Sequence, residues 1–252
     1  MVNPFLLGGA ALCILGMVCA PALAGAPFRT DDPESVDYQH WEFDLFSTGI
    51  HVPGATVAAL PGLEANYGAA PNLQLHVLIS LGYNSVSGNR SGFALGDVEV
   101  GAKFRFLSPS DEDWFPQAAV FPLVEVPAGN QKLGFSSGHV QIFLPVWLQK
   151  DFDPWSIYGG GGYWISPGFG NRNSWFYGVA LWRSLGDSLR LGVEIFHQTK
   201  VVTVGRDTTG FSLGAIYDFS EKWHLLGSVG TGLQNSSSTN QFSYYAGVQL
   251  TF

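Results

Sequence analysis

The stretch from Gly96 to Phe106 alternates between two kinds of side chain. The odd-numbered positions are ionic apart from one glycine: Asp97, Glu99, Gly101, Lys103 and Arg105. The even-numbered positions from 98 onward are all apolar: Val98, Val100, Ala102, Phe104 and Phe106. A β-strand turns alternate side chains to opposite faces, so this spacing predicts a strand with one ionic and one apolar face. In a soluble sandwich the apolar face is inside, whereas in a transmembrane barrel it meets lipid and the charges line the lumen.

Strand-like segments continue along the rest of the chain. Most have 10–13 residues, which exceeds the ~5–6 common in soluble sheets and suits the ~9–11 needed to cross a bilayer at a tilt. The pattern therefore predicts an all-β fold, an antiparallel transmembrane β-barrel of about twelve strands. The expected strands are 40–50, 58–68, 73–83, 94–106, 114–127, 139–150, 155–165, 174–184, 189–198, 208–219, 223–234 and 241–252.

The connections between these segments support the barrel. If the first strand starts in the periplasm, the connections on that side have 3–7 residues and those on the opposite side have 6–11. Short periplasmic turns with longer outer loops are typical of outer-membrane barrels, and an even strand count places both termini in the periplasm. The last strand has an apolar face that ends on Phe252, which predicts the barrel insertion machinery as a partner, with outer-membrane lipid around the barrel.

Composition separates this chain from other classes of protein. Of its 252 residues only 13% are charged, which is too few for an ordinary soluble surface, and 46% are hydrophobic, which is too many for a disordered chain. The formal net charge of −8 argues against a nucleic-acid partner. After residue 24 no apolar run reaches the ~20 residues of a membrane helix, so a membrane form must be a closed barrel.

The first 24 residues have the features of a signal peptide. An uncharged apolar run ends in Ala22-Leu23-Ala24, which predicts cleavage before Gly25, with an uncleaved membrane anchor as the alternative. Both cysteines, Cys13 and Cys19, lie here, so the mature chain would hold no disulfide or cysteine metal site. The expected organisation is a signal peptide (1–24), an irregular periplasmic lead-in (25–39) and a barrel (40–252), located in the outer membrane of a gram-negative cell.

Charged residues on the polar faces of the strands are expected to line the lumen. Most of them are acidic, which suggests a weakly cation-preferring pore or one for neutral solutes, rather than a pore for acidic sugars. The alternative is a salt-bridged core that fills the barrel, because buried charges need partners. The candidates are Glu42, Asp44, Glu64, Asp97, Glu99, Lys103, Arg105, Glu125, Arg190, Glu194 and Asp218.

Two prolines fall inside neighbouring strands. Pro122 and Pro145 would lie nearly opposite each other if the 128–138 loop closes their hairpin, and each removes a donor from the ladder. One hypothesis is a kink in the wall that gives apolar solutes a lateral route. The other is a tolerated bulge without function.

Nothing in the sequence indicates catalysis or a cofactor. None of the six histidines sits in a G-x-S-x-G or H-E-x-x-H arrangement, and His197, the nearest candidate for a lipid hydrolase, is expected to face lipid. We expect no enzyme activity, no cofactor and no metal.

Two stretches resemble a known family. Pro27-Phe28-Arg29-Thr30-Asp31-Asp32-Pro33-Glu34, followed by His40-Trp41-Glu42-Phe43, is similar to the start of the bacterial meta-pathway phenol-degradation outer-membrane proteins. Tyr158–Ile165, with Pro167-Gly168 and Asn171-Arg172-Asn173, resembles a mid-barrel motif of their transporter-like members. The resemblance implies an outer-membrane barrel presumed to move small molecules, and it supplies no catalytic residues.

Together these observations favour a channel or transporter for passive passage of small solutes, aromatic or apolar ones among them. A filled, non-conducting barrel with a structural or interaction role is the first alternative. A secreted soluble sandwich is the second.

Overall fold

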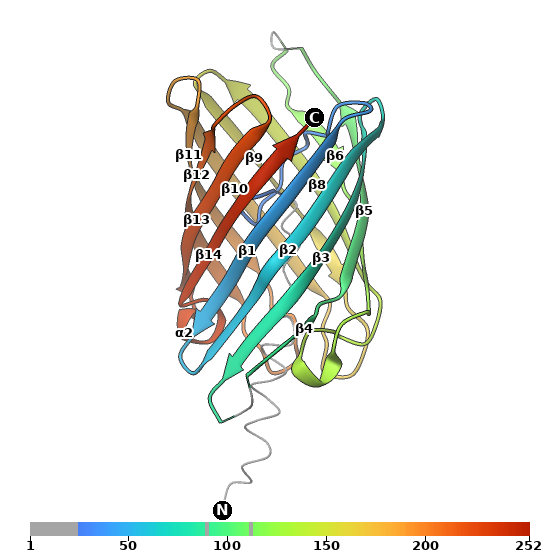
Figure 1. Cartoon of the computed structure of the whole chain (residues 1–252), viewed down its shortest axis with the longest axis vertical. Helices are drawn as coiled ribbons and strands as arrows, with labels where there is room; N and C mark the ends of the chain where they lie inside the picture. The colour runs from blue at the N-terminus through green and yellow to red at the C-terminus, as the bar shows by residue number, and fades with distance from the viewer. Residues whose placement is uncertain (1–24, 89–90, 111–112) are drawn as a thin grey trace, which may run out of the picture.

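The computed structural model describes residues 25–88, 91–110 and 113–252, and it forms one closed antiparallel barrel (Figure 1). The predicted signal peptide lies outside these residues. The strands are β1 (Trp41–Val52), β2 (Ala55–Ala70), β3 (Leu73–Val86), β4 (Gly92–Leu95), β5 (Val98–Leu107), β6 (Gln117–Val120), β7 (Leu123–Val126), β8 (Gln141–Phe152), β9 (Trp155–Ile165), β10 (Ser174–Ser184), β11 (Leu189–Gln198), β12 (Thr208–Asp218), β13 (Trp223–Gln234) and β14 (Phe242–Thr251).

Two strands of the barrel wall are each divided into two pieces. β4 and β5 both pair with β3, and β6 and β7 both pair with β5 and β8, so each couple occupies one position in the wall. The described residues therefore form a barrel of twelve wall strands, which closes where β1 pairs with β14. The sequence-based prediction of a twelve-stranded antiparallel barrel is confirmed.

The apolar face of each strand lies on the outside of the barrel. Along β5, Val100 and Phe104 are 39% and 47% exposed, whereas Glu99 and Lys103, on the opposite face, are each 3% exposed. The same alternation recurs in β3, β11 and β14. An apolar exterior around a polar, buried interior is the arrangement of a barrel in lipid.

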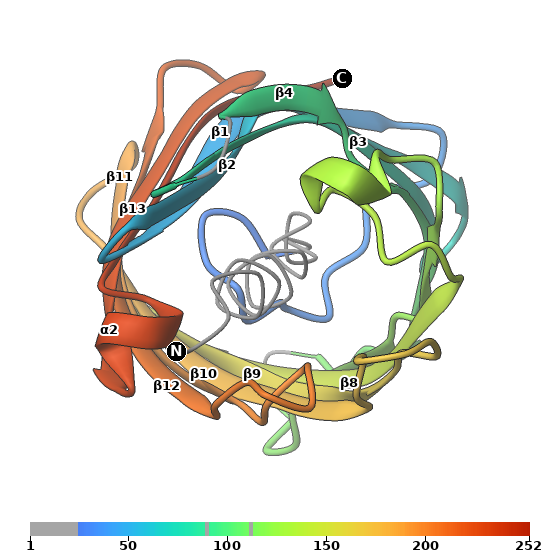
Figure 2. The ribbon, with the colours of Figure 1, turned by 90° about the horizontal axis from the view of Figure 1, so that it is seen from below.

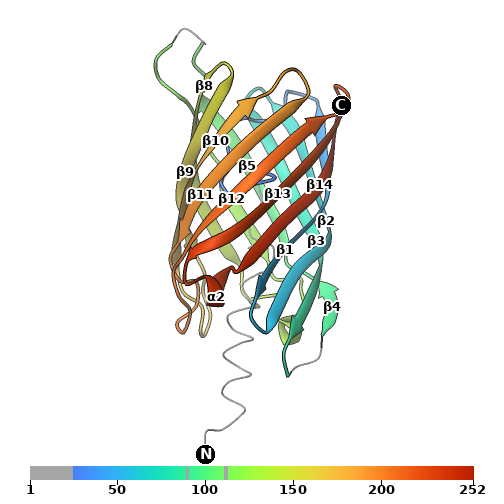
Figure 3. The same ribbon diagram turned by 90° about the vertical axis from the view of Figure 1, so that its left-hand side faces the viewer.

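The two ends of the barrel differ in their connections. We call the end that holds Trp41 and Phe252 the C-terminal rim; there the Phe252 backbone N–H donates to the Trp41 carbonyl at 3.0 Å. The opposite end, the loop rim, carries the helices η1 (Gln131–Leu133) and α2 (Ser236–Thr239), and Figure 3 shows α2 at the end of β13 away from the C-terminus.

The β1–β2 connection differs from the expected loop 51–57. The strands extend to Val52 and Ala55, which leaves a two-residue turn, and Gly54 adopts a positive φ of 84° there. Tight hairpin turns need such left-handed backbone, which glycine adopts without a steric penalty. The predicted asymmetry fails at this hairpin, and also at the C-terminal rim, where the connection 108–116 between β5 and β6 has nine residues. The other connections at the C-terminal rim have two to four residues, and the others at the loop rim have five to fourteen.

Residues 25–39, which we call the inner segment, run inside the barrel (Figure 2). They contain neither a named strand nor a named helix, and the side chains around the tip are among the most buried of the chain, with Phe28 at 1%, Thr30 at 0% and Asp31 at 1% exposure, whereas residues 37–39 are exposed. No helix within the described residues is long and apolar enough to cross a membrane. The irregular conformation of the inner segment matches its proline-rich sequence, and its place in the lumen is a structural finding.

Candidate functional site

The tip of the inner segment is anchored on one glutamate of the barrel wall. Glu194 on β11 accepts hydrogen bonds from the backbone N–H groups of Arg29 and Thr30, at 2.9 and 2.6 Å. The Arg29 side chain donates to Gln198 at 2.6 Å, and its guanidinium lies 4.5 Å from the centre of the Phe196 ring. Burial lowers the pKa of Arg29 to about 10, against the opposing effect of Glu194.

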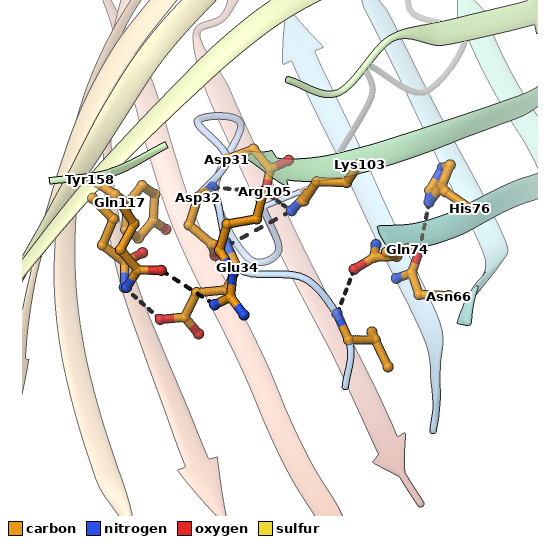
Figure 4. Close-up of polar contacts among 12 residues, drawn as sticks. Asp31, Asp32, Glu34, Asn66, Gln74, His76, Lys103, Arg105, Gln117 and Tyr158 are labelled. Atoms are coloured by element: carbon orange, nitrogen blue, oxygen red, sulfur yellow. Dashed lines mark hydrogen bonds and ion pairs between the residues drawn. The ribbon is translucent and has the colours of Figure 1, made fainter. Parts of the chain in front are cut away.

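A buried ion pair fixes the middle of the inner segment (Figure 4). Lys103 on β5 lies 3.0 Å from Asp31 Oδ1 and 3.8 Å from Asp32 Oδ1, and the Lys103 and Asp31 side chains are 4% and 1% exposed. Burial raises the pKa of Asp31 to about 7, although Lys103 acts to lower it. Docking of the segment therefore depends on Lys103, whose charge offsets the free-energy cost of holding the Asp31 carboxylate away from water.

Neutral amide side chains hold the part of the segment nearer the C-terminal rim. Gln149 donates to Glu34 at 2.6 Å and to Asp151 at 3.1 Å, and Gln74 accepts from the Val36 backbone N–H at 2.9 Å. Burial, and then the neighbouring Asp32, raises the pKa of Glu34. These contacts come from β3 and β8, which are separated in the wall by the positions of β4/β5 and β6/β7, so the segment joins two different parts of the wall.

A second ionic cluster lies on β2, β3 and β5. His76 stands 3.3 Å from Glu64 and 3.0 Å from Glu99, and its Nδ1 lies 2.8 Å from the Asn66 side-chain oxygen. Asn66 also donates to Glu42 at 3.0 Å and to Glu64 at 2.9 Å. His76 and Asn66 thus tie three acids of three strands into one network.

The other predicted lumen residues also point inward, with varied partners. Asp44 is 2% exposed and accepts a 3.4 Å hydrogen bond from Gln249, and Glu125 accepts from Gln141 at 2.7 Å. Asp97 accepts from the backbone of Gly129 and Ser137, whereas Arg105 donates to Asn72 and Gln117, and Arg190 lies 3.6 Å from Asp218. Glu42, Asp44, Glu64 and Glu99 gather on one side of the barrel, and Glu194, Arg190 and Asp218 lie on the other. Their role in solute passage stays a prediction.

Two of the four wall residues that hold the inner segment, Lys103 and Glu194, are among the predicted lumen charges. Gln149 is not among them, and Arg29, Asp31 and Glu34 fall in the predicted periplasmic lead-in. The one available signal was the polar face of residues 73–83, which includes Gln74 and His76. A polar amide and a histidine on the lumen face of a strand need partners inside the barrel.

The wall near Pro122 is interrupted but keeps its register. Residue pairs on both sides of the break, Val120 with Val146 and Leu123 with Phe143, place Pro122 across from Leu144 and leave no inserted residue. The Phe121 backbone N–H reaches the Pro145 carbonyl at 3.4 Å, and the Ala102 N–H reaches the Pro122 carbonyl at 3.3 Å. The break coincides with Phe121, whose ring is fully buried inside the barrel. A lateral route at Pro122 and Pro145 stays a prediction.

Two cavities border the inner segment on opposite sides. One of about 310 Å³ opens toward the C-terminal rim and is lined by Asp32, Glu34, Asp151, Trp155 and other residues. The other, of about 40 Å³, lies toward the loop rim and is lined by Phe28, Arg29, Glu194 and Asn240, among others. Within residues 25–88, 91–110 and 113–252 no group of three or more His, Cys, Asp or Glu side chains could hold a metal ion.

Similarity to solved structures establishes the fold class. The COG4313 outer membrane channel from Pseudomonas putida F1 superposes with a TM-score of 0.74 at 15% identity, covering 88% of this chain and 98% of that one. The KdgM porin, solved with disordered oligogalacturonate, gives 0.56 at 11% identity, over 84% and 99% of the two chains. The NanC porin gives 0.53 at 12% identity, over 82% and 98%. This chain has the fold of outer-membrane β-barrels.

No family model matches the chain, and no curated protein matches its sequence. The likeness is therefore one of architecture.

Proposed function

We propose that this chain is an outer-membrane channel for passive passage of small solutes, narrowed by its own inner segment. The observation that carries this proposal is the position of residues 26–34 between two cavities that lie toward opposite ends of the barrel. Fourfold contact with the wall, through Glu194, Lys103, Gln149 and Gln74, holds the segment there. These contacts and the packing of Phe28 against Trp182 are all non-covalent and separate from the strand-to-strand hydrogen bonds of the wall, so we expect that the segment can undock without unfolding the barrel.

The chemistry of the lumen favours cations and neutral solutes over anions. Among the predicted lumen charges, acids outnumber bases by eight to three. Passage would be diffusion down a gradient, with selectivity set by the polar lining. The resemblance of Pro27–Glu34 and Tyr158–Ile165 to transporter-like members of the phenol-degradation family supports small aromatic or apolar solutes as cargo.

A filled, non-conducting barrel is the second candidate, and the packing of the interior favours it. The Phe28 ring lies 4.8 Å from the Trp182 ring inside one buried cluster, and Phe121, Phe143 and Trp147 belong to a second. Together with the inner segment, these side chains occupy much of the lumen. In this case the acids would serve only to balance Lys103, His76 and Arg29.

The same architecture supports a proposal for insertion and orientation. We propose that the outer membrane is the location, with both termini in the periplasm, because Trp41 and Phe252 lie together at the C-terminal rim. The apolar outer face of β14 would be recognised by the insertion machinery. Accessibility of cysteines introduced at each rim to an impermeant reagent in whole cells would test the orientation.

Conductance in a planar bilayer distinguishes the two functions. Refolded protein that acts as a channel gives discrete current steps, with a reversal potential that shows a preference for cations in a salt gradient. A barrel that is inserted, as judged by its heat-modifiable mobility, and that passes neither current nor solute even after removal of residues 25–36 would support the filled-barrel function.

A further inference from the structure

The cavity toward the loop rim has an unusual polar lining. It lies between the tip of the inner segment and the walls formed by β1, β2 and β11–β14. Phe28, Val57 and Ala59 supply apolar surface, and Glu194 and Asn240 supply polar groups, although these two side chains are only 1% and 3% exposed. A cavity with both kinds of surface can bind a small molecule that has a polar and an apolar part.

Four polar atoms of the lining residues have no hydrogen-bond partner in the described part of the chain. They are Glu194 Oε2, Asn240 Oδ1, Arg29 Nε and the Tyr245 hydroxyl oxygen, which come from β11, from the residue after α2, from the inner segment and from β14. The other groups of the same side chains are satisfied: Glu194 Oε1 accepts from Arg29 and Thr30, and the Asn240 amide donates to Ser243 at 3.1 Å. Unpartnered buried groups are costly, so a bound molecule that pairs with them would gain free energy.

The four atoms define the chemistry of that molecule. Glu194 Oε2 and Asn240 Oδ1 are acceptors, Arg29 Nε is a donor, and the Tyr245 hydroxyl can donate or accept. A hydroxyl group both donates and accepts, so it can pair with either kind of atom. An ammonium would leave Arg29 Nε unpaired and be repelled by its charge, and a carboxylate would be repelled by Glu194.

The size of the cavity further limits the class of molecule that it can bind. A volume of about 40 Å³ accommodates about three water-sized groups. This is too small for an aromatic ring, since benzene occupies an engineered cavity of roughly 150 Å³. We propose that this cavity binds the hydroxylated end of a small neutral polyol. This inference rests on the proposed function, because a polyol would reach the site from the loop rim of a solute channel.

Binding can be measured apart from conductance. Saturation-transfer NMR on the refolded protein in detergent micelles would use erythritol as the probe, with butylammonium and butyrate as charged molecules of similar size. Glu194→Gln keeps an oxygen for the Arg29 and Thr30 N–H groups and turns the free oxygen into an N–H donor. Glu64→Gln makes the same change at a buried glutamate outside the cavity.

We expect saturable binding of erythritol to the wild type, weaker binding of both charged molecules, and an affinity lowered about tenfold in Glu194→Gln, the effect of one hydrogen bond to a charged group. Glu64→Gln should bind as the wild type does. Ser243→Leu places a larger side chain in the cavity and should abolish binding of erythritol. If the Ser243→Leu protein does not fold, Asn240→Ala takes its place and should weaken binding of erythritol.

Three results would overturn the assignment. The first is the absence of a saturable erythritol signal, which would mean that water is the only occupant. The second is an equal affinity for erythritol in the wild type, in Glu194→Gln and in Ser243→Leu or Asn240→Ala, and the third is tighter binding of butylammonium than of erythritol. Erythritol binding without conductance would contradict the channel function alone, whereas conductance without erythritol binding would contradict this site alone.

Discussion

Replacement of Lys103 by methionine tests how the inner segment is held. The variant keeps most of the side-chain volume and leaves Asp31, only 1% exposed, without its cation at 3.0 Å. Removing one partner of a buried ion pair costs about 3–5 kcal/mol. A shift of that size changes the ratio of docked to undocked segment roughly 150- to 5,000-fold, because 1.36 kcal/mol corresponds to a factor of ten.

The acid–base behaviour of Asp31 sets how this cost varies with pH. Without Lys103 the docked carboxyl can take up a proton, and protonating a carboxyl of ordinary pKa costs about 4 kcal/mol at pH 7 but less than about 2 kcal/mol at pH 5. The Lys103→Met variant should therefore undock strongly at neutral pH and much less at pH 5. The double variant Lys103→Met with Asp31→Asn removes both charges and should dock as the wild type does.

Single-channel recording in planar bilayers measures this effect. At pH 7 Lys103→Met should show open events far more often than the wild type, and the double variant should return to wild-type behaviour. Equal currents in the wild type and Lys103→Met, with both barrels shown to be folded by heat-modifiable mobility, would refute the reasoning. So would a double variant that is as open as the single one, since the loss of Lys103 would then act through its contact with the Phe121 ring at 5.0 Å.

Three further predictions follow from the same contacts. In the wild type, docking should strengthen as the pH falls from about 7 toward 4, because the docked pKa of Asp31, about 7, exceeds its ordinary value of 3.8; a conductance that rises as the pH falls through this range would contradict it. Phe28→Ala should weaken docking by about 3–5 kcal/mol and change the fluorescence of Trp182, and an unchanged spectrum and conductance would argue against this packing. His76→Leu should lower the unfolding temperature of the barrel, because Glu64 and Glu99 are buried and would lose their polar partner at His76, and a melting curve equal to that of the wild type would exclude this role.

Strand periodicity predicted the barrel wall well because the alternation of polar and apolar residues within a strand identifies its two faces without information from other strands. The residues 94–106 show both the strength and the limit of this reasoning. Val100, Phe104, Glu99 and Lys103 lie on the faces that alternation assigns to them. The interruption between β4 and β5 depends on Asp97, which accepts hydrogen bonds from the backbone of residues 129 and 137, so it is set by a distant loop that periodicity does not register.

The inner segment could not be located from sequence for a related reason. Its conformation has no period, and its place is fixed by contacts such as Asp31 with Lys103, 72 residues away, and Thr30 with Glu194, 164 residues away. Charge alone did not reveal these pairs, because acids on the lumen face have several possible partners. The polar faces of the strands indicated that the lumen is lined with charge, and the structure shows which of these charges hold the segment.

A reversible lock on the inner segment tests the central claim most directly. A Cβ atom added at Gly178 would clash with the Thr30 hydroxyl, so cysteines at these two positions lie close enough for a disulfide, and residues 25–252 contain no other cysteine. In the Lys103→Met background, single-channel recording of Thr30→Cys/Gly178→Cys should show a closed barrel when oxidised and open events after reduction. Equal conductance in the oxidised and reduced states would show that the inner segment does not control passage through this barrel.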